Sequence, residues 1–412
     1  MFVKPCFPNE CYYKNRLTMT ETLISLQRSK KVYRVAVGSL FFLLGFCSAT
    51  WASRIPGIQQ SLGISDSFLG IILFALPVGS MLSLSFAGRL VTQWGSKKVA
   101  VSALLSYAAL LCGIGLVQSV PVLIAVLVFF GMAGNAANIA INTQAVGVEN
   151  RYGRNIMASF HGIWSLAGFT AAGIGTVMMG RNVLPQYHFI GSAALALAGL
   201  AACFPYLLPE EEQQAVAAPQ QKKFFTKPHS SLVKLGLIAF CCMMCEGAMF
   251  DWSGVYFQKV VLAEPEWIGA GYTAFMCTMA TGRFVADWVV HRTGFQKTVQ
   301  GSGVLILTGL LIAVLFPTVL TAITGFLIVG FGVSSVIPLV YSEAGRSVHA
   351  SPGMALTAVS SIGFLGFLLG PPLIGLVAGA ASLRLSFLLI AAFGAIIILL
   401  VQYVNIGKQT AE

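Results

Sequence analysis

Apolar stretches separated by short polar segments follow one another along the chain from about residue 33 to residue 404. Each stretch is about twenty residues or longer, which is the length of helix that crosses the hydrocarbon core of a bilayer. The pattern predicts an all-α membrane protein with 12 transmembrane helices. The predicted spans are residues 33–53, 66–90, 97–118, 120–148, 154–180, 187–208, 232–258, 266–290, 297–317, 318–346, 351–379 and 382–404.

One polar connection is much longer than the others. It covers residues 209–231, where three consecutive glutamates precede a stretch of Gln, Pro and Lys that is typical of a flexible linker. The linker divides the spans into two sets of six. We therefore predict an N-terminal six-helix bundle over residues 32–208 and a C-terminal bundle over 232–405, with tails at 1–31 and 406–412.

Composition and charge support a membrane protein and predict its orientation. Of the 412 residues 57% are hydrophobic and 9% are charged, and the mean hydropathy is +0.81. A soluble domain of this length would need more charge on its surface. Cytoplasmic segments carry an excess of Lys and Arg. With both termini in the cytoplasm, all but four of the 25 basic residues lie on that side, the exceptions being Arg54, Arg181, Lys259 and Arg384.

The two halves of the chain resemble each other at a shift of 199 positions. Small residues recur at this offset in the pairs Gly70 and Gly269, Gly95 and Gly294, Gly131 and Gly330, and Ala145 and Ala344. Small residues permit close helix approach in lipid, so some matches are expected by chance. Together they favour an internal duplication. Duplicated bundles predict a solute path at their interface near the middle of the membrane.

The predicted span at residues 232–258 carries two acids, Glu246 and Asp251. An acid at this depth is costly unless it faces protein or water, so both are candidates for proton coupling. Their spacing of five residues separates them by about 140° around a helix. We therefore expect Glu246 to face a cavity and exchange a proton, and Asp251 to face a neighbouring helix. The alternative is that each acid is neutral or locally paired and only fastens helices together.

Polar side chains also line the fourth and fifth predicted spans. Asn135, Asn138 and Asn142 follow a helical i, i+3, i+7 pattern and form one stripe. A polar stripe in lipid must face protein or water. Histidine among amides can titrate near neutrality, although a packing role for a lone histidine is equally plausible. The predicted solute-binding residues are Asn135, Asn138, Asn142, Gln144, His161, Trp164, Trp51 and Trp252.

Charged residues near the span ends are candidates for gates. At the outer side, Arg54 and Asp251 would form a salt bridge if the repeat-related first and seventh spans meet. In the alternative, Trp51 and Trp252 belong to the interfacial aromatic belt and Arg54 extends to lipid headgroups. At the inner side, we predict a lock among the residues Glu149, Arg151, Arg154, Asp287, Arg292, Glu343 and Arg346.

Several of these motifs resemble a known family. The segment from Gly88 to Lys98 resembles the Gly-x-Leu-x-Asp-x-x-Gly-basic signature of the major facilitator superfamily, with Thr92 at the acidic position. The local sequences at residues 51–56, 142–144, 159–162 and 246–253 resemble the bacterial YbjJ-type inner-membrane permeases, relatives of fucose:proton symporters. The resemblance implies two pseudo-symmetric six-helix bundles, alternating access, and a multi-pass protein of the bacterial inner membrane.

Function classes other than transport are less consistent with the sequence. The Walker-type phosphate loop and the hydrolase and zinc-protease motifs are absent, so we expect neither an enzyme nor a cofactor or metal. The favoured function is proton-coupled transport of a small polar solute such as a sugar. We expect a monomer that binds no nucleic acid. Efflux of lipophilic compounds is the rival, based on Met243, Met244, Met249, Phe250 and Met276. A non-transporting membrane sensor is the alternative from another class.

Overall fold

A computed structural model describes residues 8–153, 156–209, 229–347 and 352–404, with side chains from residue 30 onward except those at 287, 352 and 353. The described chain is helical throughout and has no β-strand. Its elements are α1 (Pro8–Ser53), α2 (Ile55–Ser61), α3 (Asp66–Trp94), α4 (Ser96–Leu116), α5 (Val120–Tyr152), α6 (Met157–Gly180), α7 (Pro185–Cys203), the short 3₁₀ helix η1 (Phe204–Tyr206), α8 (Ser230–Lys259), α9 (Ala270–Leu315), α10 (Val319–Gly345), α11 (Pro352–Ala380) and α12 (Leu383–Gln402).

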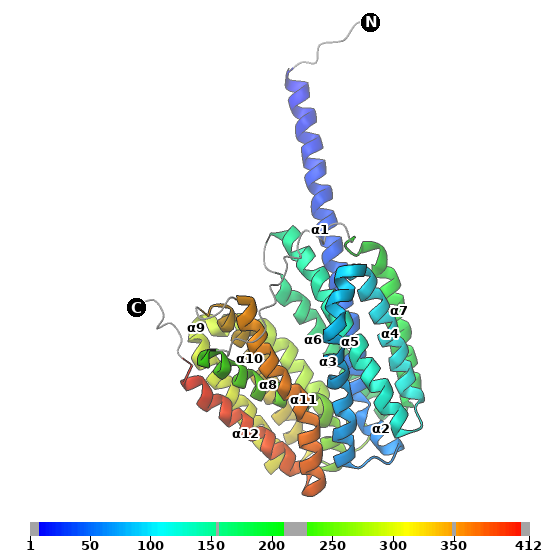
Figure 1. Cartoon of the computed structure of the whole chain (residues 1–412), viewed down its shortest axis with the longest axis vertical. Helices are drawn as coiled ribbons and strands as arrows, with labels where there is room; N and C mark the ends of the chain where they lie inside the picture. The colour runs from blue at the N-terminus through cyan, green and yellow to red at the C-terminus, as the bar shows by residue number, and fades with distance from the viewer. Residues whose placement is uncertain (1–7, 154–155, 210–228, 348–351, 405–412) are drawn as a thin grey trace.

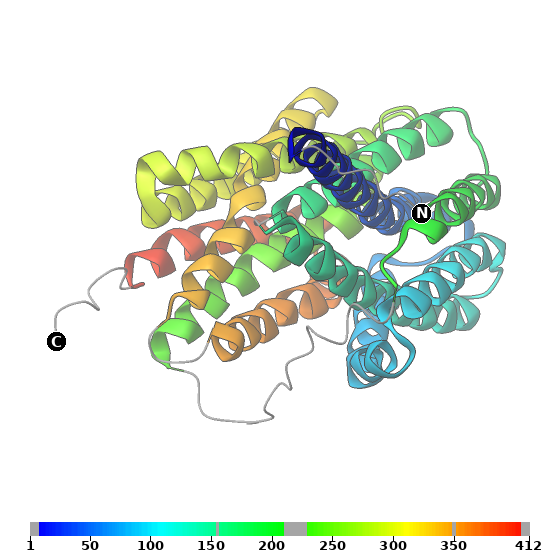
Figure 2. The ribbon, with the colours of Figure 1, turned by 90° about the horizontal axis from the view of Figure 1, so that it is seen from above.

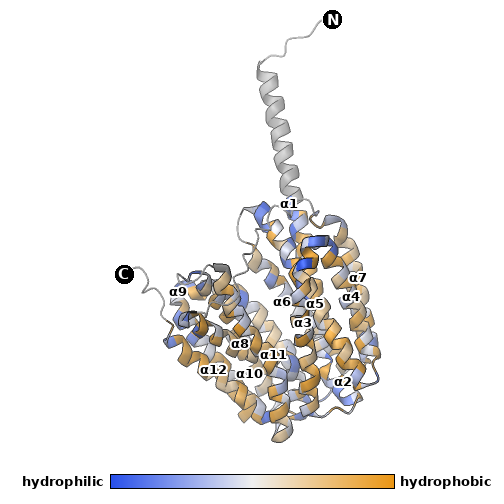
Figure 3. Ribbon diagram, viewed as in Figure 1, coloured by the Kyte–Doolittle hydropathy of each residue, from blue (hydrophilic) through white to orange (hydrophobic). Residues whose placement is uncertain are grey.

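The predicted all-α membrane fold is confirmed. Within the described residues, eleven helical stretches are long and apolar enough to cross a bilayer. The remaining crossing is the first part of α9, residues 270–293, which a kink at Gly294 separates from the second part. Apolar residues cover the middle of the helices, and polar residues gather toward their ends (Figure 3). This distribution matches a bundle whose sides contact hydrocarbon.

The helices form two groups, α1–α7 and α8–α12, that lie beside each other (Figures 1 and 2). They run close together at the end that holds α2 and spread toward the end where both termini lie (Figure 1). We call these the sealed end and the terminal end. Across the interface α3 packs against α11 and α6 packs against α9. Two pairs of helices therefore carry most of the contact between the halves.

Glycine contacts within each half repeat at the predicted offset of 199. A Cβ on Gly131 would collide with the backbone of Leu76 and Ser80, where α5 crosses α3. A Cβ on Gly330 would collide with the backbone of Phe275 and Met279, where α10 crosses α9. Both contacts of the second half lie 199 positions after their counterparts. The crossings are thus equivalent, as an internal duplication requires.

The interface between the halves follows the same symmetry. Gly70 of α3 lies against the backbone of Gly375 in α11, and Gly269 at the start of α9 lies against Thr176 in α6. Thr176 and Gly375 are again 199 positions apart. The two interface pairs, α3 with α11 and α9 with α6, are therefore related by the repeat. Three of these four positions are glycines and the fourth is a threonine, and small residues allow helices to approach closely.

The turns between the second and third spans of each half are also equivalent. Gly95 has φ of 82° and Gly294 has φ of 77°, a region that favours glycine because it lacks a Cβ. Gly95 ends α3 and precedes α4, and Gly294 divides α9. The two glycines that the sequence aligned thus have the same backbone role.

Alanine at the two equivalent crossings should destabilise the protein to a similar degree. G131A and G330A each place a methyl group against a backbone carbonyl, and overpacking of this kind typically costs about 1–3 kcal/mol. We expect both variants to unfold at lower temperature than the wild type in a detergent melt followed by tryptophan fluorescence. Gly301 has open space around it, so G301A is the matched control. Melting temperatures of G131A or G330A at or above that of G301A would contradict the crossings described.

Candidate functional site

The central polar contact of the molecule joins α8, α9 and α6. Glu246 of α8 is buried, with 8% of its surface exposed, and its Oε1 lies 3.7 Å from Nη2 of Arg283 in α9. Nη1 of Arg283 donates a hydrogen bond to Oγ of Ser165 in α6. The same guanidinium carbon is 6.0 Å from the ring centroid of Trp164. Arg283 therefore connects an acid of its own half to the facing helix of the other half.

Two further titratable side chains are close to this ion pair. The half-buried Tyr341 of α10 lies close enough to Glu246 for an electrostatic interaction, and His161 of α6 is similarly close to Arg283. His161 is exposed and its ring meets that of Phe41 edge-on at 5.4 Å. The predicted residues His161 and Trp164 thus lie with Glu246 at the interface of the halves.

An aromatic layer separates this pair from the sealed end. Phe250 follows Glu246 by one helical turn, so both side chains lie on the same side of α8. Its ring centroid is 6.1 Å from that of Trp164 in α6 and 5.5 Å from that of Tyr272 in α9. Phe275 and Phe367 complete the layer, with ring centroids 6.0 Å and 6.5 Å from that of Phe250. The aromatic rings keep the sealed-end side of the pair apolar.

Asp251 has surroundings different from those of Glu246. It is half-buried and lies near Tyr272, whose hydroxyl is buried without a hydrogen-bond partner. Between the side chains that the structure describes, Asp251 forms neither a hydrogen bond nor an ion pair. The two acids of α8 therefore differ in environment, because only Glu246 has an arginine beside it.

The predicted outer salt bridge between Arg54 and Asp251 is not formed in this structure. Arg54 follows the end of α1, is 3% exposed, and donates a hydrogen bond to the backbone carbonyl of Val183 in its own half. Trp51 and Trp252 are both buried. Burial takes them out of the lipid-facing aromatic belt that the alternative interpretation gave them.

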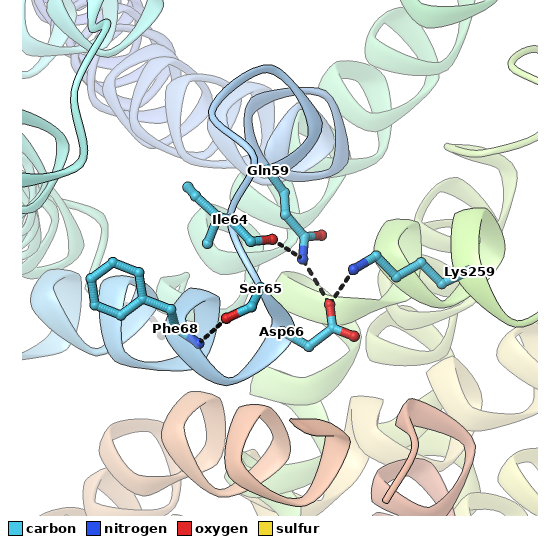
Figure 4. Close-up of polar contacts among 6 residues, drawn as sticks. All are labelled: Gln59, Ile64, Ser65, Asp66, Phe68 and Lys259. Carbon is cyan, nitrogen blue, oxygen red and sulfur yellow. Dashed lines mark hydrogen bonds and ion pairs between the residues drawn. The ribbon is translucent and has the colours of Figure 1, made fainter. Parts of the chain in front are cut away.

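A different ion pair joins the halves at the sealed end. Nζ of Lys259, at the end of α8, pairs with Oδ1 of Asp66, at the start of α3 (Figure 4). Nε2 of Gln59 donates to the same carboxylate oxygen at 2.7 Å, and Nε2 of Gln258 donates to Oε1 of Gln60 at 3.1 Å. We call these residues the sealed-end lock. Asp66 and Lys259 both lie at the outer ends of predicted spans, and that shared position could have identified them.

Part of the span-four polar stripe is engaged in packing within the N-terminal half. Nδ2 of Asn135 donates to Oγ of Ser83 at 2.6 Å. Gln144 is fully buried; its amide donates to Oγ of Ser96 at 2.9 Å and accepts from the backbone N–H of Leu208 at 3.0 Å. These two amides fasten α5 to its neighbours.

The other two asparagines of the stripe are accessible. Asn138 is exposed and Asn142 is half-buried. Nδ2 of Asn142 donates a hydrogen bond to Oδ1 of Asn138 at 3.0 Å. Phe129 is exposed nine residues earlier, and nine residues turn a helix by about half a circle relative to the starting direction. The asparagines therefore lie on the side of α5 opposite to the exposed Phe129. A phenylalanine facing lipid would direct Asn138 and Asn142 toward the interior.

The residues of the predicted inner lock have mostly local contacts. Oε2 of Glu149 accepts two backbone hydrogen bonds at 2.8 Å at the start of α6. Arg151 lies over the ring of Tyr33, and Arg292 lies over that of Trp288. Glu343 is half-buried and Arg346 exposed. Arg154 and the side chain of Asp287 lie outside the described part of the structure. The inner lock stays a prediction.

Two helical bundles meet along close crossings, and Arg283 of a buried ion pair in the C-terminal half also contacts the N-terminal half. This arrangement is typical of a multi-pass membrane transporter of small solutes. The chain belongs to the Major Facilitator Superfamily, whose family model matches residues 37–352. An uncharacterized MFS-type transporter of Yersinia pestis is 30% identical over 358 residues, which cover 86% of this chain and 91% of the relative.

Solved structures share the fold. The nucleoside transporter NupG has a TM-score of 0.72 at 14% sequence identity, over 90% of this chain and 98% of NupG. The transporter FucP in its outward conformation has a TM-score of 0.63 at 17% identity, over 92% of this chain and all of FucP. At these identities the likeness concerns the fold alone.

Breaking the sealed-end lock should shift the conformational equilibrium toward opening of that end. The Lys259 side chain is 39% exposed, and an exposed ion pair contributes at most about 1 kcal/mol. D66N or K259Q should therefore raise the population open at the sealed end about two- to fivefold. Spin labels at Ser61 and Leu262 would report a larger share of long distances in either variant. The D66K/K259D charge swap should restore the wild-type distribution. Identical distributions in the wild type and both single variants would contradict the lock.

Proposed function

We propose that this protein is a secondary active transporter that moves a small polar solute together with a proton by alternating access. The observation that carries the proposal is the buried Glu246 and Arg283 pair, which reaches Ser165 on the opposite half. We further propose that it acts as a monomer in the bacterial inner membrane with both termini cytoplasmic. The bacterial relative and the distribution of Lys and Arg support these assignments.

The charge of Glu246 would control how strongly Arg283 is held to α8. With Glu246 ionised, the two opposite charges compensate each other in a site with little water, where an uncompensated charge is costly. A proton on Glu246 removes that attraction and leaves Arg283 with its contacts to Ser165 and Trp164. Because those contacts belong to α6, protonation changes the balance between the two halves. This gives proton binding a direct effect on their relative position.

The accessible groups near the pair favour a polar, mostly neutral solute. His161, Asn138 and Asn142 offer hydrogen bonds, and the half-buried ring of Trp164 offers a stacking surface. Ring stacking together with directional hydrogen bonds suits sugars and related ring compounds. Asp251, which has no hydrogen-bond or ion-pair partner among the described side chains, is a second proposed proton site on the sealed-end side of the aromatic layer.

Efflux of lipophilic compounds is less well supported by the same geometry. Of the residues that favoured efflux, Met243 is half-buried and Phe250 is 8% exposed. Met244, Met249 and Met276 are buried within the helix packing, at 1% exposure or less. A lipophilic ligand would need these flexible side chains to line an open surface. Their burial assigns them to the interior of the bundle. The polar solute is therefore the preferred substrate class.

Glu246→Gln should abolish proton-driven accumulation while leaving exchange of the solute. The amide cannot take up a proton but keeps the size of the side chain, so uphill uptake should fall about tenfold or more, a typical magnitude for coupling between two sites. Proteoliposomes with an internal pH dye and a panel of sugars, sugar acids and nucleosides would measure both flux and proton movement. Nucleosides belong in the panel because NupG shares the fold.

Glu264 provides a matched control, because it is an exposed glutamate beyond the end of α8. E264Q should accumulate solute as the wild type does. Full coupled uptake by E246Q would exclude Glu246 as the proton carrier. Solute binding without flux in wild-type vesicles would instead indicate a sensor.

A further inference from the structure

A groove at the terminal end is lined by neither residue of the central ion pair. It has a volume of about 590 Å³ and runs along α1, with further walls from α5 and α6. Lys31, Arg34, Val35 and Phe42 line it at helical spacing, so one face of α1 forms its floor. The membrane-spanning part of α1 begins at Lys30. The groove thus starts at the first turn of the span and follows it inward.

The outer part of the groove is cationic. Lys31 is exposed and forms no hydrogen bond or ion pair with the described residues. Arg34 donates to Oγ of Ser159 at 3.2 Å and lies 5.6 Å from the ring centroid of Tyr152. Neither cation pairs with an acid in the described part of the chain. Two positive charges without a counter-charge at the same site favour an anionic ligand.

The inner part of the groove is apolar. Val35, Phe42 and Ile163 supply the wall beyond the two cations. Phe42 follows Arg34 by eight residues, which places it about 12 Å further along the helix axis. A ligand that satisfies both parts needs a negative charge at one end and a hydrocarbon segment of comparable length attached to it. A soluble phosphate meets only the first requirement.

We propose that this groove binds an anionic phospholipid of the leaflet that borders the terminal end. The phosphate lies between Lys31 and Arg34, and an acyl chain follows Val35, Phe42 and Ile163. The position of the cations at the first turn of the span matches the depth of headgroups. Because the lipid contacts α1 and α6 together, its binding stabilises the N-terminal half.

The test is retention of phosphatidylglycerol against phosphatidylethanolamine by the purified full-length protein, measured by native mass spectrometry and by melting temperature. The wild type should keep phosphatidylglycerol preferentially and melt higher with it. In K31Q/R34Q the ratio of phosphatidylglycerol to phosphatidylethanolamine retained should fall about tenfold. Each cation near an anionic lipid contributes on the order of a few-fold in affinity. K31Q alone changes an exposed side chain that forms no hydrogen bond or ion pair with the described residues. It should lose part of the preference, even if the double variant does not fold.

Matched controls separate the groove from general electrostatics. R89Q/K297Q removes two exposed basic residues at the terminal end outside the groove and should retain the wild-type preference. Equal retention by the wild type, K31Q and K31Q/R34Q would overturn the proposal, and so would an equal loss in R89Q/K297Q. Stabilisation by glycerol phosphate alone would identify a soluble phosphate site instead. A changed Michaelis constant for the solute with unchanged lipid retention would assign the groove to the transport path.

Discussion

A charge buried in a membrane protein must be compensated, and in this molecule the compensation crosses helices that belong to different halves. Glu246 neutralises Arg283 within the C-terminal half, while Ser165 and Trp164 hold the same guanidinium from the N-terminal half. Any relative movement of the halves must therefore rearrange this contact, since leaving either charge without a partner is costly. The electrostatics of one arginine and the mechanics of the interface are physically linked.

The rest of the interface is suited to such movement. The crossing at Gly70 brings two backbones together, and at Gly269 the contact is with the small side chain of Thr176, which also hydrogen-bonds to Thr273 of α9. Because the two crossings are related by the internal repeat, they lie in equivalent positions on either side of the molecule. Rigid six-helix units that meet along smooth, symmetric contacts can rock without repacking their interiors. The rigid parts and the sliding parts of the fold thus have separate sequence determinants.

Much of this architecture could be predicted from the sequence, because it depends on hydropathy and periodicity. The spans, the halves and the offset of 199 all followed from such patterns, while a cavity in front of Glu246 stays a prediction. Side-chain partners did not follow from such patterns. Arg283 lies inside the predicted span 266–290 but enters the sequence analysis only as one of the basic residues on the cytoplasmic side. An arginine within a span was the available signal. In this structure Arg54 donates to the carbonyl of Val183 in its own half, and its pairing with Asp251 stays a prediction. The choice of such partners depends on tertiary packing, which one sequence does not encode locally.

The two ion pairs differ in how much dissolved salt can affect them. The ammonium group of Lys259 is open to the surrounding solution, whereas Glu246 is shielded by protein. Screening weakens exposed pairs and leaves buried ones nearly unchanged. The salinity of the compartment facing the sealed end therefore acts on one end of the transporter alone. The ionic strength of that compartment thereby influences the resting conformation, independently of solute and proton.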